Sequence, residues 1–473
     1  MARTFRPYTM DQRLLLPLDM REWLPDEHLA SFVSDAVDAM DLSAILRKYE
    51  KDDARGRAGY HPRMMVKLLV YGYCTGKRSS RGIERATYDE VPFRVLAADQ
   101  HPDHDSVADF RKRHLKELGG LFVQVLRLCE KAGLVKLGHV AVDGSKVKAN
   151  ASKHKAMSYA RMTETEKRLT EEVEKLLADA ERVDAAEDAT FGKGKRGDEL
   201  PTELRRRESR LKKIREAKAA LEQEARERAE QEAAEAKAKL EERAAKEKAK
   251  EKAQDPFVGA KGSPPEVRNP ADAQPDPKAQ RNFTDPESRI MKDGASKSFE
   301  QAYNAQLAVD AASQVIVATN VTQQANDKKQ LIPVLEKLVT NLGRQPAKVT
   351  ADSGYFSEQN ITAPALAGVD LYVPPNRQKH GEKPGEAATR GPKSEVAERM
   401  REKLRTPEGH QTYSRRKVIV EPVFGQMKEW LGFRRFSLRG LENVQAEWNF
   451  VSAAHNLMKL FRANRRPVLP ATA

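Results

Sequence analysis

The chain has 473 residues, of which 39% are apolar and 33% charged, and its formal net charge is +14. This length exceeds one typical core and predicts two or three domains. No apolar run approaches the roughly 20 residues of a membrane-spanning helix, and the N-terminus lacks the apolar core of a signal peptide. Cys74 and Cys129 form no Cys-x-x-Cys pair, which predicts buried thiols in a reducing, cytoplasmic compartment.

The positive charge is concentrated near the C-terminus. Residues 401–473 contain 14 lysines and arginines against 6 aspartates and glutamates. Cations that neutralise phosphates release condensed counterions, so this distribution favours a polyanionic partner such as nucleic acid. A soluble protein that merely repels its own copies would have the same composition, and charge alone does not separate the two.

Residues 1–130 are predicted to form a mostly helical domain. Apolar residues recur at helical spacing in LASFVSDAVDAMDLSAIL and in the segment that follows Pro62, and proline is accepted in a first helical turn. Basic side chains on the polar sides of these helices suit contacts with a DNA backbone or groove. These candidates are Lys77, Arg78, Arg81, Arg111, Lys112 and Arg113. A packing or dimerisation domain with a solvated basic face is the open alternative.

Two histidines and two aspartates crowd the turn before the last of these helices. Because His101, Asp103, His104 and Asp105 share one proline-containing turn, we interpret them as turn and cap residues and not as a metal site. We expect the helix to be capped at Asp105.

The first strand is predicted within residues 137–155, where HVAVDGSKVKAN alternates apolar and polar residues and ends near Asp143. Residues 156–252 then read as an inserted antiparallel helical hairpin. Its second helix carries Leu211, Ile214 and Leu221 at coiled-coil-like spacing before an Ala/Glu/Lys tract; a solvated low-complexity helix is the alternative. Residues 253–285 are rich in proline and predict a linker.

The core is predicted to resume over residues 286–460. We expect two strands joined by a turn at 311–313, a helix capped at Asn326, a strand ending at Asp352, one more strand, and a last helical region containing Glu421. Residues 461–473 form a basic tail. Without the insertion, this order predicts a three-layer α/β core around a mixed sheet.

Three acids from distant parts of the chain are the candidate catalytic residues and metal ligands. Asp143 and Asp352 end neighbouring strands in this topology, and the helix with Glu421 should pack across the same edge of the sheet. A lone carboxylate such as Glu421 is commonly a surface charge, but three acids beside a basic surface suggest a site for divalent metal at a nucleic-acid phosphate. Hard oxygen ligands favour Mg²⁺ or Mn²⁺ over zinc, and such ions can activate a water or a 3′-hydroxyl for displacement at phosphorus.

Two further aspartates compete for the second position. Asp310 lies at the expected hairpin tip, and Asp327 lies at the expected helix start. We prefer Asp352 because Gly354 and Tyr355 mark a loop that directly follows a strand. Lys146 and Lys148 follow the first acid and are candidate contacts to the DNA backbone.

These segments resemble the DDE transposases of bacterial insertion sequences. The resemblance is carried by VAVDGSKVKANAS, TDPESRIM, FEQAYNAQLAVD, VTADSGYF and RRKVIVEPVFGQMKEW, and by GYHPRMMVKLLVYGYCTGKRSSRGIE and DHDSVADFRKRH in the N-terminal part. It covers most of the chain outside the hairpin and linker. It implies an RNase H-like catalytic core, a helical N-terminal transposase domain, and Asp143, Asp352 and Glu421 as metal ligands.

The family signature around the last acid is Tyr-x2-Arg-x3-Glu-x6-Lys. Here Glu421 and Lys428 keep the x6 spacing, and Tyr413 and Arg416 keep x2. Arg416 to Glu421 is one residue too long, whereas Lys417 has the x3 spacing, so either residue could be the basic partner. The resemblance implies that the tyrosine and these bases contact the cleaved DNA end. Pro422 predicts a kink or a restart of the helix at Glu421.

The resemblance implies a transposase that binds the terminal inverted repeats of its element, nicks them with metal assistance and joins the 3′-hydroxyl to target DNA. It also implies at least a homodimer when two ends are synapsed on the nucleoid, and the inserted hairpin is a candidate for that contact. Two alternatives stay open, namely an RNase H-like nuclease without strand transfer and a DNA-binding protein with a decayed catalytic core.

Overall fold

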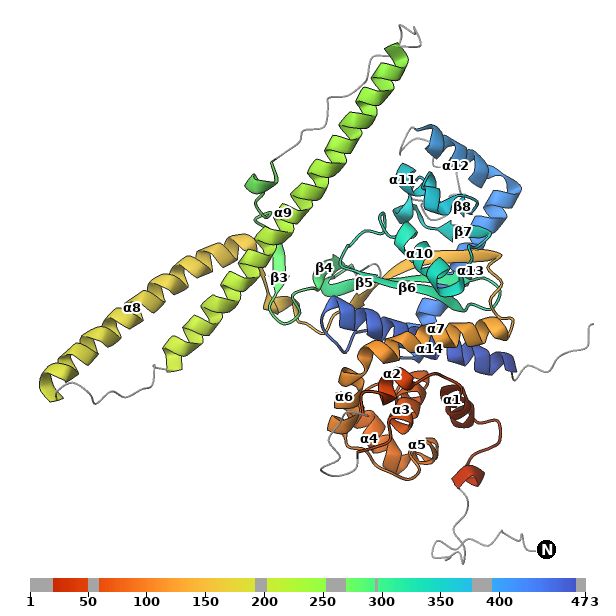
Figure 1. Cartoon of the computed structure of the whole chain (residues 1–473), viewed down its shortest axis with the longest axis horizontal. Coiled ribbons are helices and arrows are strands. Elements are labelled where there is room, and N and C mark those ends of the chain that lie inside the picture. The colour runs from red at the N-terminus through yellow and green to blue at the C-terminus, as the bar shows by residue number, and fades with distance from the viewer. Residues whose placement is uncertain are drawn as a thin grey trace, which may run out of the picture. The chain divides into compact units, whose positions relative to one another are not determined.

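The computed structural model describes residues 20–49, 59–191, 202–251, 269–293, 297–376 and 394–464. The chain forms two compact units (Figure 1). Unit 1 contains the chain up to Lys148 and from Tyr303 onward, and unit 2 contains Ala149–Ala302. None of the helices within the described ranges is long and apolar enough to cross a membrane.

A mixed sheet forms the centre of unit 1. Its strands are β1 (His139–Lys148), β5 (Phe299–Asp310), β6 (Ile316–Thr322), β7 (Lys348–Ala351) and β8 (Asp370–Tyr372), in the order β6-β5-β1-β7-β8. Strands β1, β7 and β8 are parallel, whereas β5 and β6 form the predicted antiparallel hairpin. Ala311 N donates to His139 O, so β5 ends where β1 begins and the two strands run in opposite directions. This is the mixed sheet expected of an RNase H-like core.

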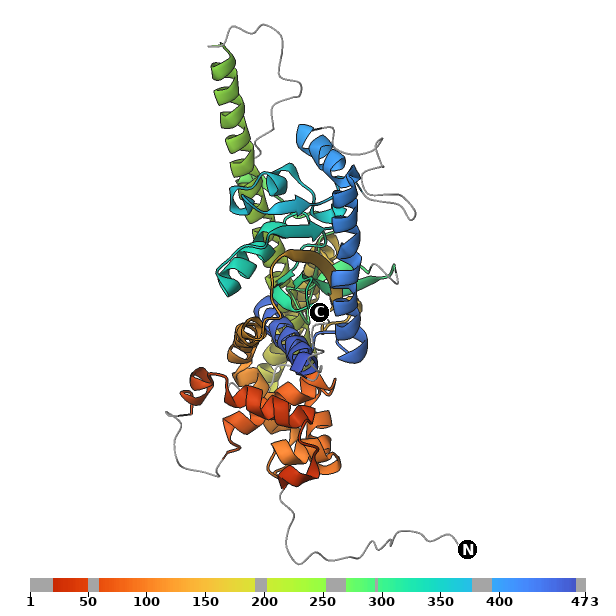
Figure 2. The same ribbon diagram turned by 90° about the vertical axis from the view of Figure 1, so that its right-hand side faces the viewer.

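Helices cover both faces of this sheet. Helix α10 (Leu331–Leu342) packs on β6, and α13 (Pro407–Gly425) packs on β1, β7 and β8. Figure 2 shows these two helices on opposite sides of the strands, which confirms the three-layer architecture. The prediction that α10 is capped at Asn326 is wrong. The helix begins after Gln330, which places Pro333 in the first turn, where backbone N–H groups have no helical acceptor.

The N-terminal helices belong to the same unit as the sheet. They are α1 (Leu29–Asp38), α2 (Ser43–Leu46), α3 (Pro62–Cys74), α4 (Ser80–Asp89), α5 (Val91–Leu96), α6 (His104–Arg113) and α7 (Leu115–Lys131). Helix α7 packs along α14 (Leu441–Asn464). A Cβ on Gly119 would lie 3.0 Å from Ala446 Cα, so the glycine permits this close approach. The predicted boundary at residue 130 therefore does not separate two bodies.

Both cysteines face α14 and are buried, as predicted. Cys74 Sγ donates to Ala454 O, and Cys129 Sγ donates to Asn456 O. Burial raises the pKa of each thiol to about 12, which keeps both in the unreactive protonated form. At the start of α6, Asp103 is the cap and not Asp105, because Asp103 Oδ1 accepts from Ser106 N at 2.7 Å.

Unit 2 contains the predicted antiparallel hairpin, made by α8 (Tyr159–Phe191) and α9 (Thr202–Glu251). Three cross-helix contacts fix the antiparallel register: Tyr159–Glu222 at 2.8 Å, Glu166–Lys218 at 2.9 Å and Glu172–Arg207 at 3.3 Å. The apolar positions at helical spacing meet in one cluster, which confirms the sequence pattern. This cluster contains Met162, Leu169, Leu211, Ile214, Ala217 and Leu221.

Part of the expected linker is a strand. Within residues 253–285, β3 (Gln280–Asn282) pairs antiparallel with β2 (Ala156–Ser158), and the buried Asn282 donates from Nδ2 to Ser152 O at 2.8 Å. Strand β4 (Arg289–Lys292) then pairs with the first residues of β5. The composition of the segment is typical of a linker, but these long-range pairings cannot be read from composition. Residues 253–268 lie outside the described ranges.

Truncating Ile214 should loosen the hairpin of unit 2. Its side chain is 1% exposed, and removing such a buried aliphatic group costs about 2–4 kcal/mol of unfolding free energy. We expect Ile214→Ala to lower amide-exchange protection in α8 around Leu169 while protection in β1 stays unchanged. Lys212→Ala, an exposed position of the same helix, is the matched control. Equal loss of protection in β1 would contradict the division into two units.

Candidate active site

The parallel pairing of β1 and β7 brings two of the predicted acids together. Val142 of β1 is opposite Ala351 of β7 in the register. Asp143 and Asp352 are the next residues along these two neighbouring strands, so they lie side by side. Contrary to expectation, β1 does not end at Asp143 but continues to Lys148. Asp143 Oδ1 accepts from Gly144 N, and Asp352 Oδ1 accepts from Gly354 N, each at 2.8 Å. These bonds fix the orientation of both carboxylates.

Arg416 reaches this pair from α13. Its guanidinium donates to Asp143 Oδ2 at 2.9 Å, and its side chain is only 10% exposed. The neighbouring Tyr413 is also buried, with its ring centroid 6.0 Å from the guanidinium carbon. The family signature left the basic partner open between Arg416 and Lys417. In the structure Arg416 contacts the acid, whereas Lys417 is exposed.

A third carboxylate, Asp327, lies at the same site. Its Oδ1 accepts from Asn304 Nδ2 at 2.6 Å and from Gln306 Nε2 at 2.7 Å, and it forms a 3.5 Å ion pair with Lys146. Its negative charge raises the pKa of both other aspartates. The sequence favoured Asp352 over Asp327, which was expected at a helix start; in the structure Asp327 lies in the bend before α10, close to both other aspartates.

Strand β5 supplies the floor beneath these acids. Gln306 donates to Asp327 and accepts a hydrogen bond from the buried Tyr355. A Cβ on Gly144 would clash with Gln306 and lie 2.8 Å from Asp327 Oδ1. A side chain at position 144 would therefore displace Gln306 and disturb its hydrogen bond to Asp327.

Burial and mutual repulsion disfavour the ionised forms of Asp143 and Asp352. Burial raises the pKa of Asp143 to about 6; Arg416 acts in the opposite direction, and the charges of Asp352 and Asp327 add to the rise. Burial likewise raises the pKa of Asp352, with Arg416 opposing it and Asp327 adding to it. The same anions raise the pKa of Arg416 despite its burial and keep it charged.

Glu421 is not part of this cluster in the structure. It is exposed, and it makes no hydrogen bond or ion pair with any residue in the described ranges. Within those ranges no three acidic, histidine or cysteine side chains are close enough to share a metal ion. The π-helical turn Gln426–Trp430 that follows α13 also contacts β1, because Lys428 Nζ donates to Ser145 Oγ at 2.6 Å.

The donor set at Asp143 and Asp352 fits a hard divalent cation. Carboxylate oxygens are the ligands that Mg²⁺ and Mn²⁺ prefer, and the raised pKa values of both aspartates mark a place where added positive charge is favourable. Arg416 supplies part of that charge here. The third predicted ligand, Glu421, is not assembled with them.

Helix α13 does not restart at Glu421 but runs through Pro422 without a break. Helix α13 continues to Gly425, and a π-helical turn follows at Gln426–Trp430. Proline has no N–H to donate to the carbonyl four residues earlier. That carbonyl, Val418 O, instead accepts from Gln314 Nε2 at 2.9 Å. A side chain from the β5–β6 turn therefore replaces the missing helical hydrogen bond.

The basic residues predicted to contact DNA divide into two groups. Arg78 donates to Gly432 O at 2.6 Å with its guanidinium over the Phe433 ring, and Arg111 donates to Arg78 O at 2.6 Å. These two side chains hold the loop after α13 against the N-terminal helices, so their contacts do not support a role in DNA binding. Exposed side chains that remain candidates are Arg81, Arg113, Lys148 and Lys417.

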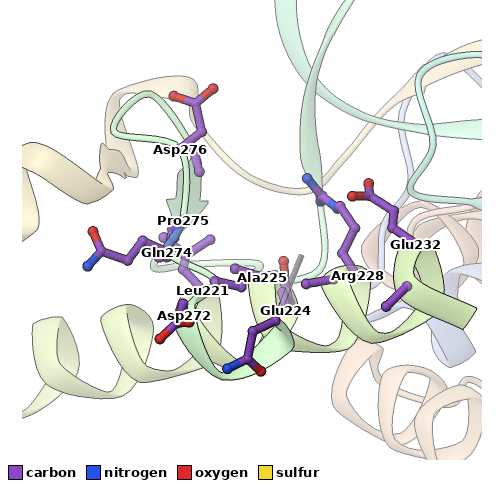
Figure 3. Close-up of a pocket in the computed structure, with 14 residues that line it drawn as sticks. Leu221, Glu224, Ala225, Arg228, Glu232, Asp272, Gln274, Pro275 and Asp276 are labelled. Atoms are coloured by element: carbon purple, nitrogen blue, oxygen red, sulfur yellow. The ribbon is translucent and has the colours of Figure 1, made fainter. Parts of the chain in front are cut away.

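Unit 2 contains a groove of about 780 Å³ between α9 and residues 269–279 (Figure 3). Its carboxylates Glu232, Asp272 and Asp276 project from separate positions and do not converge on one point. Glu224 accepts from Arg281 at 2.6 Å and from Arg289 at 2.9 Å, so its charge is neutralised by ion pairs within unit 2. The groove offers no cluster of catalytic groups.

Two family models match this chain. The model described as "Transposase DDE domain" matches residues 271–457, and the model described as "Transposase domain (DUF772)" matches residues 18–113. The first match includes Asp327, Asp352 and Glu421 but not Asp143, whose place at the site comes from the pairing of β1 with β7. No curated protein and no solved structure matches the chain.

Proposed function

The chain belongs to the DDE transposases of insertion-sequence type, and on that premise we propose that it cuts DNA at the terminal inverted repeats of its own element and joins the freed 3′-hydroxyl to target DNA. The observation that carries this proposal is the pair Asp143 and Asp352 on adjacent parallel strands, with Arg416 donating into it at 2.9 Å. Such a buried, oriented carboxylate pair is suited to phosphoryl transfer.

We assign Asp143, Asp352 and Glu421 as the ligands of Mg²⁺ or Mn²⁺. A divalent cation bound there would lower the pKa of the attacking water or hydroxyl and stabilise the leaving oxygen. The assignment of the two aspartates rests on their proximity and hard oxygen donors, whereas that of Glu421 rests on the family signature. Glu421 lies in the chain between Arg416 and Lys428, which both contact β1, and we propose that it turns toward the aspartates when metal and DNA are bound.

Basic residues around the acids would hold the DNA backbone. Arg416 offsets negative charge at the acids, while Lys146 and Lys428 approach the same site through Asp327 and Ser145. Arg416 and Tyr413 are buried beside the carboxylates, so they would reach only a strand that enters the site. Lys417 and Lys148 would contact the DNA outside it, and Arg81 and Arg113 would do so from the N-terminal helices.

We also propose that two copies act together, since two element ends must be processed in one event. The hairpin of residues 156–252 remains the candidate for this contact, because its helices present a long charged surface beyond their shared apolar cluster. Residues 1–130 are proposed to bind the element ends.

A strand-transfer assay tests the proposed reaction. Pre-cleaved, labelled element ends with a free 3′-hydroxyl are incubated with a supercoiled plasmid and Mg²⁺, and joined products are counted. We expect joined product with the full chain and none with Asp352→Asn. Cleavage of intact ends without any joining would identify a nuclease, and end binding without either reaction would identify a DNA-binding protein.

A further inference from the structure

A second basic surface of unit 1 lies on the side of α13 that faces away from the acids. It is a groove of about 430 Å³ between α13, the β5–β6 turn and the last turns of α14. Its floor is apolar and includes Leu134 and Ile419, and its rim carries Arg415, Lys459 and Arg462. None of these residues contributes to the candidate active site described above.

Gln314 holds the three walls of this groove together. Its Nε2 donates to Val418 O of α13 at 2.9 Å, its Oε1 accepts from Lys459 Nζ of α14 at 2.8 Å, and its backbone oxygen lies 3.1 Å from His455 Nε2. Gln314 has a φ of 56°, a strained conformation for a residue with a side chain. Hydrogen bonds of Gln314 therefore hold the walls of the groove in place.

The lining of the groove is positively charged, although Arg415 also borders a neighbouring groove that contains Asp310 and Glu408. Its lining contains three basic residues and no aspartate or glutamate. Arg415 and Arg462 are exposed, and neither forms an ion pair with any residue in the described ranges. Arg462 instead lies over the ring of Trp430, 4.2 Å from its centroid, and this indole is 45% exposed. Exposed cations beside an aromatic ring form a surface that suits a nucleic-acid backbone.

The pKa values of the buried His455 and the half-buried His139 are lowered in part by these cations. Burial lowers the pKa of His455 to about 3, with Lys459 and Arg462 adding to the effect. Burial also lowers the pKa of His139 to about 4, with Arg415 and Lys348 adding to it. Both imidazoles are therefore neutral at physiological pH, and they leave the charge of the three rim cations unaltered.

The groove and the acids are close enough for one DNA duplex to reach both. Arg415 and Arg416 are consecutive residues of α13, which places them about 100° apart around the helix. Arg415 lies near His139 at the start of β1, and Asp143 is four residues further along that strand, or about 13 Å at the usual rise per residue. A duplex presents one negative charge per roughly 1.7 Å of its axis, so several phosphates lie within that span.

We propose that this groove binds the phosphodiester backbone of the same element-end duplex whose scissile bond lies at Asp143 and Asp352. The inference rests on the proposed function for the identity of the DNA, but its chemistry depends only on the groove. Arg415, Lys459 and Arg462 contact phosphates a few base pairs from the cut, and they fix how the duplex crosses α13.

The salt dependence of end binding tests this proposal. The logarithm of the association constant falls with the logarithm of the salt concentration, and we expect Arg415→Gln/Arg462→Gln in the full chain to make this negative slope shallower by about 1.8. This is about 0.9 for each lost phosphate contact. The advantage of the wild type over this variant should then shrink by about 12-fold between 50 and 200 mM salt. Arg344→Gln/Arg399→Gln makes the same change in net charge at two exposed arginines that pair with Glu130 and Glu395, and it should leave the slope unchanged.

Two outcomes would overturn the proposal. If the groove variant and its control have the same slope as wild type, the groove does not bind DNA. If end binding is unchanged but joining of pre-cleaved ends to the plasmid falls, the groove binds target DNA and not the element end. Failure of the proposed reaction is distinguishable from failure of this proposal. If wild type binds ends but never cleaves them, the salt dependence of wild type and of the groove variant can still be compared. Thermal unfolding of each variant verifies that its fold is retained.

Discussion

Replacing Asp143 by asparagine is expected to lower the rate of end cleavage by about 10³-fold or more, while end binding changes little. Asparagine keeps the shape and the hydrogen bond from Gly144 N but removes the charge that would hold a divalent cation. Burial raises the pKa of Asp143 to about 6, so its ionised form opposes folding, but the variant also removes the charge that Arg416 donates to, and thermal unfolding verifies that the fold is retained. The measurement is cleavage of a labelled end in Mg²⁺, with binding measured separately in Ca²⁺.

A metal titration separates this effect from a structural one. Mg²⁺ should raise the unfolding temperature of wild type more than that of Asp143→Asn, since a ligand that binds only the folded state stabilises it. Asp370→Asn is the matched control, because Asp370 lies on β8 of the same sheet and pairs with Lys403. Undiminished cleavage by Asp143→Asn would remove Asp143 from the set of metal ligands.

Replacing Arg416 by methionine should destabilise the protein by about 3 kcal/mol at pH 8, because removing one partner of a buried ion pair leaves an uncompensated charge. The loss should diminish at pH 5. The folded pKa of Asp143 lies above its ordinary value of 3.8, so this carboxyl favours folding at low pH and opposes it as the pH rises through about 6. Without Arg416 that pKa rises further, and the penalty is largest where Asp143 is ionised.

Chemical denaturation of both proteins at pH 8 and pH 5 gives this comparison. Arg415→Met is the matched control, because Arg415 is the preceding residue of α13 and is exposed; it should change the unfolding free energy by less than about 0.5 kcal/mol. In a double-mutant cycle, adding Asp143→Asn to Arg416→Met should recover much of the lost stability. An equal loss at both pH values would show that Arg416 stabilises the fold through packing and not through charge.

The sequence predicted the parts of the fold that depend on local pattern and element order. Alternation around Asp143, the loop after Asp352 and the turn at 311–313 were sufficient to predict a mixed sheet with two acids on neighbouring strands, and the structure confirms this. The apolar spacing in α8 and α9 predicted their shared cluster. These signals are local: an alternation of apolar and polar residues, a turn or loop composition, or an apolar spacing within one stretch of a helix.

Asp327 was considered but given less weight than Asp352, because the residues that orient it lie on another element. Asn304 and Gln306, which orient it, lie on β5. A topological signal was available: β6 runs antiparallel to β5, and β5 runs antiparallel to β1, so β6 ends at the same edge of the sheet as β7. Residues that follow β6 must therefore emerge beside Asp352, because the ends of parallel strands meet at one edge.

The direction in which side chains point was the second feature that the sequence could not predict. Arg78 and Arg111 have the composition expected of a DNA-binding surface, yet their guanidinium groups donate to backbone oxygens within unit 1. The spacing of Glu421 and Lys428 agreed with the family signature, but only Lys428 contacts β1 in the structure. A spacing rule gives the position along α13, whereas the π-helical turn after Gly425 changes which side chains face the sheet.

Where the chain leaves the core for unit 2 and where it returns, the backbone is hydrogen-bonded to itself. Ala149 N donates to Gln301 O at 2.8 Å, so the two ends of this long excursion are neighbours. An unstructured excursion of that length would cost about 3 kcal/mol more in loop closure than a tight turn, but a module whose own ends already meet avoids most of that cost. Insertions, deletions or exchanges of the whole module can therefore accumulate during evolution without altering the register of β1 and β5, and related chains can differ widely in length at this position while keeping the same arrangement of acids.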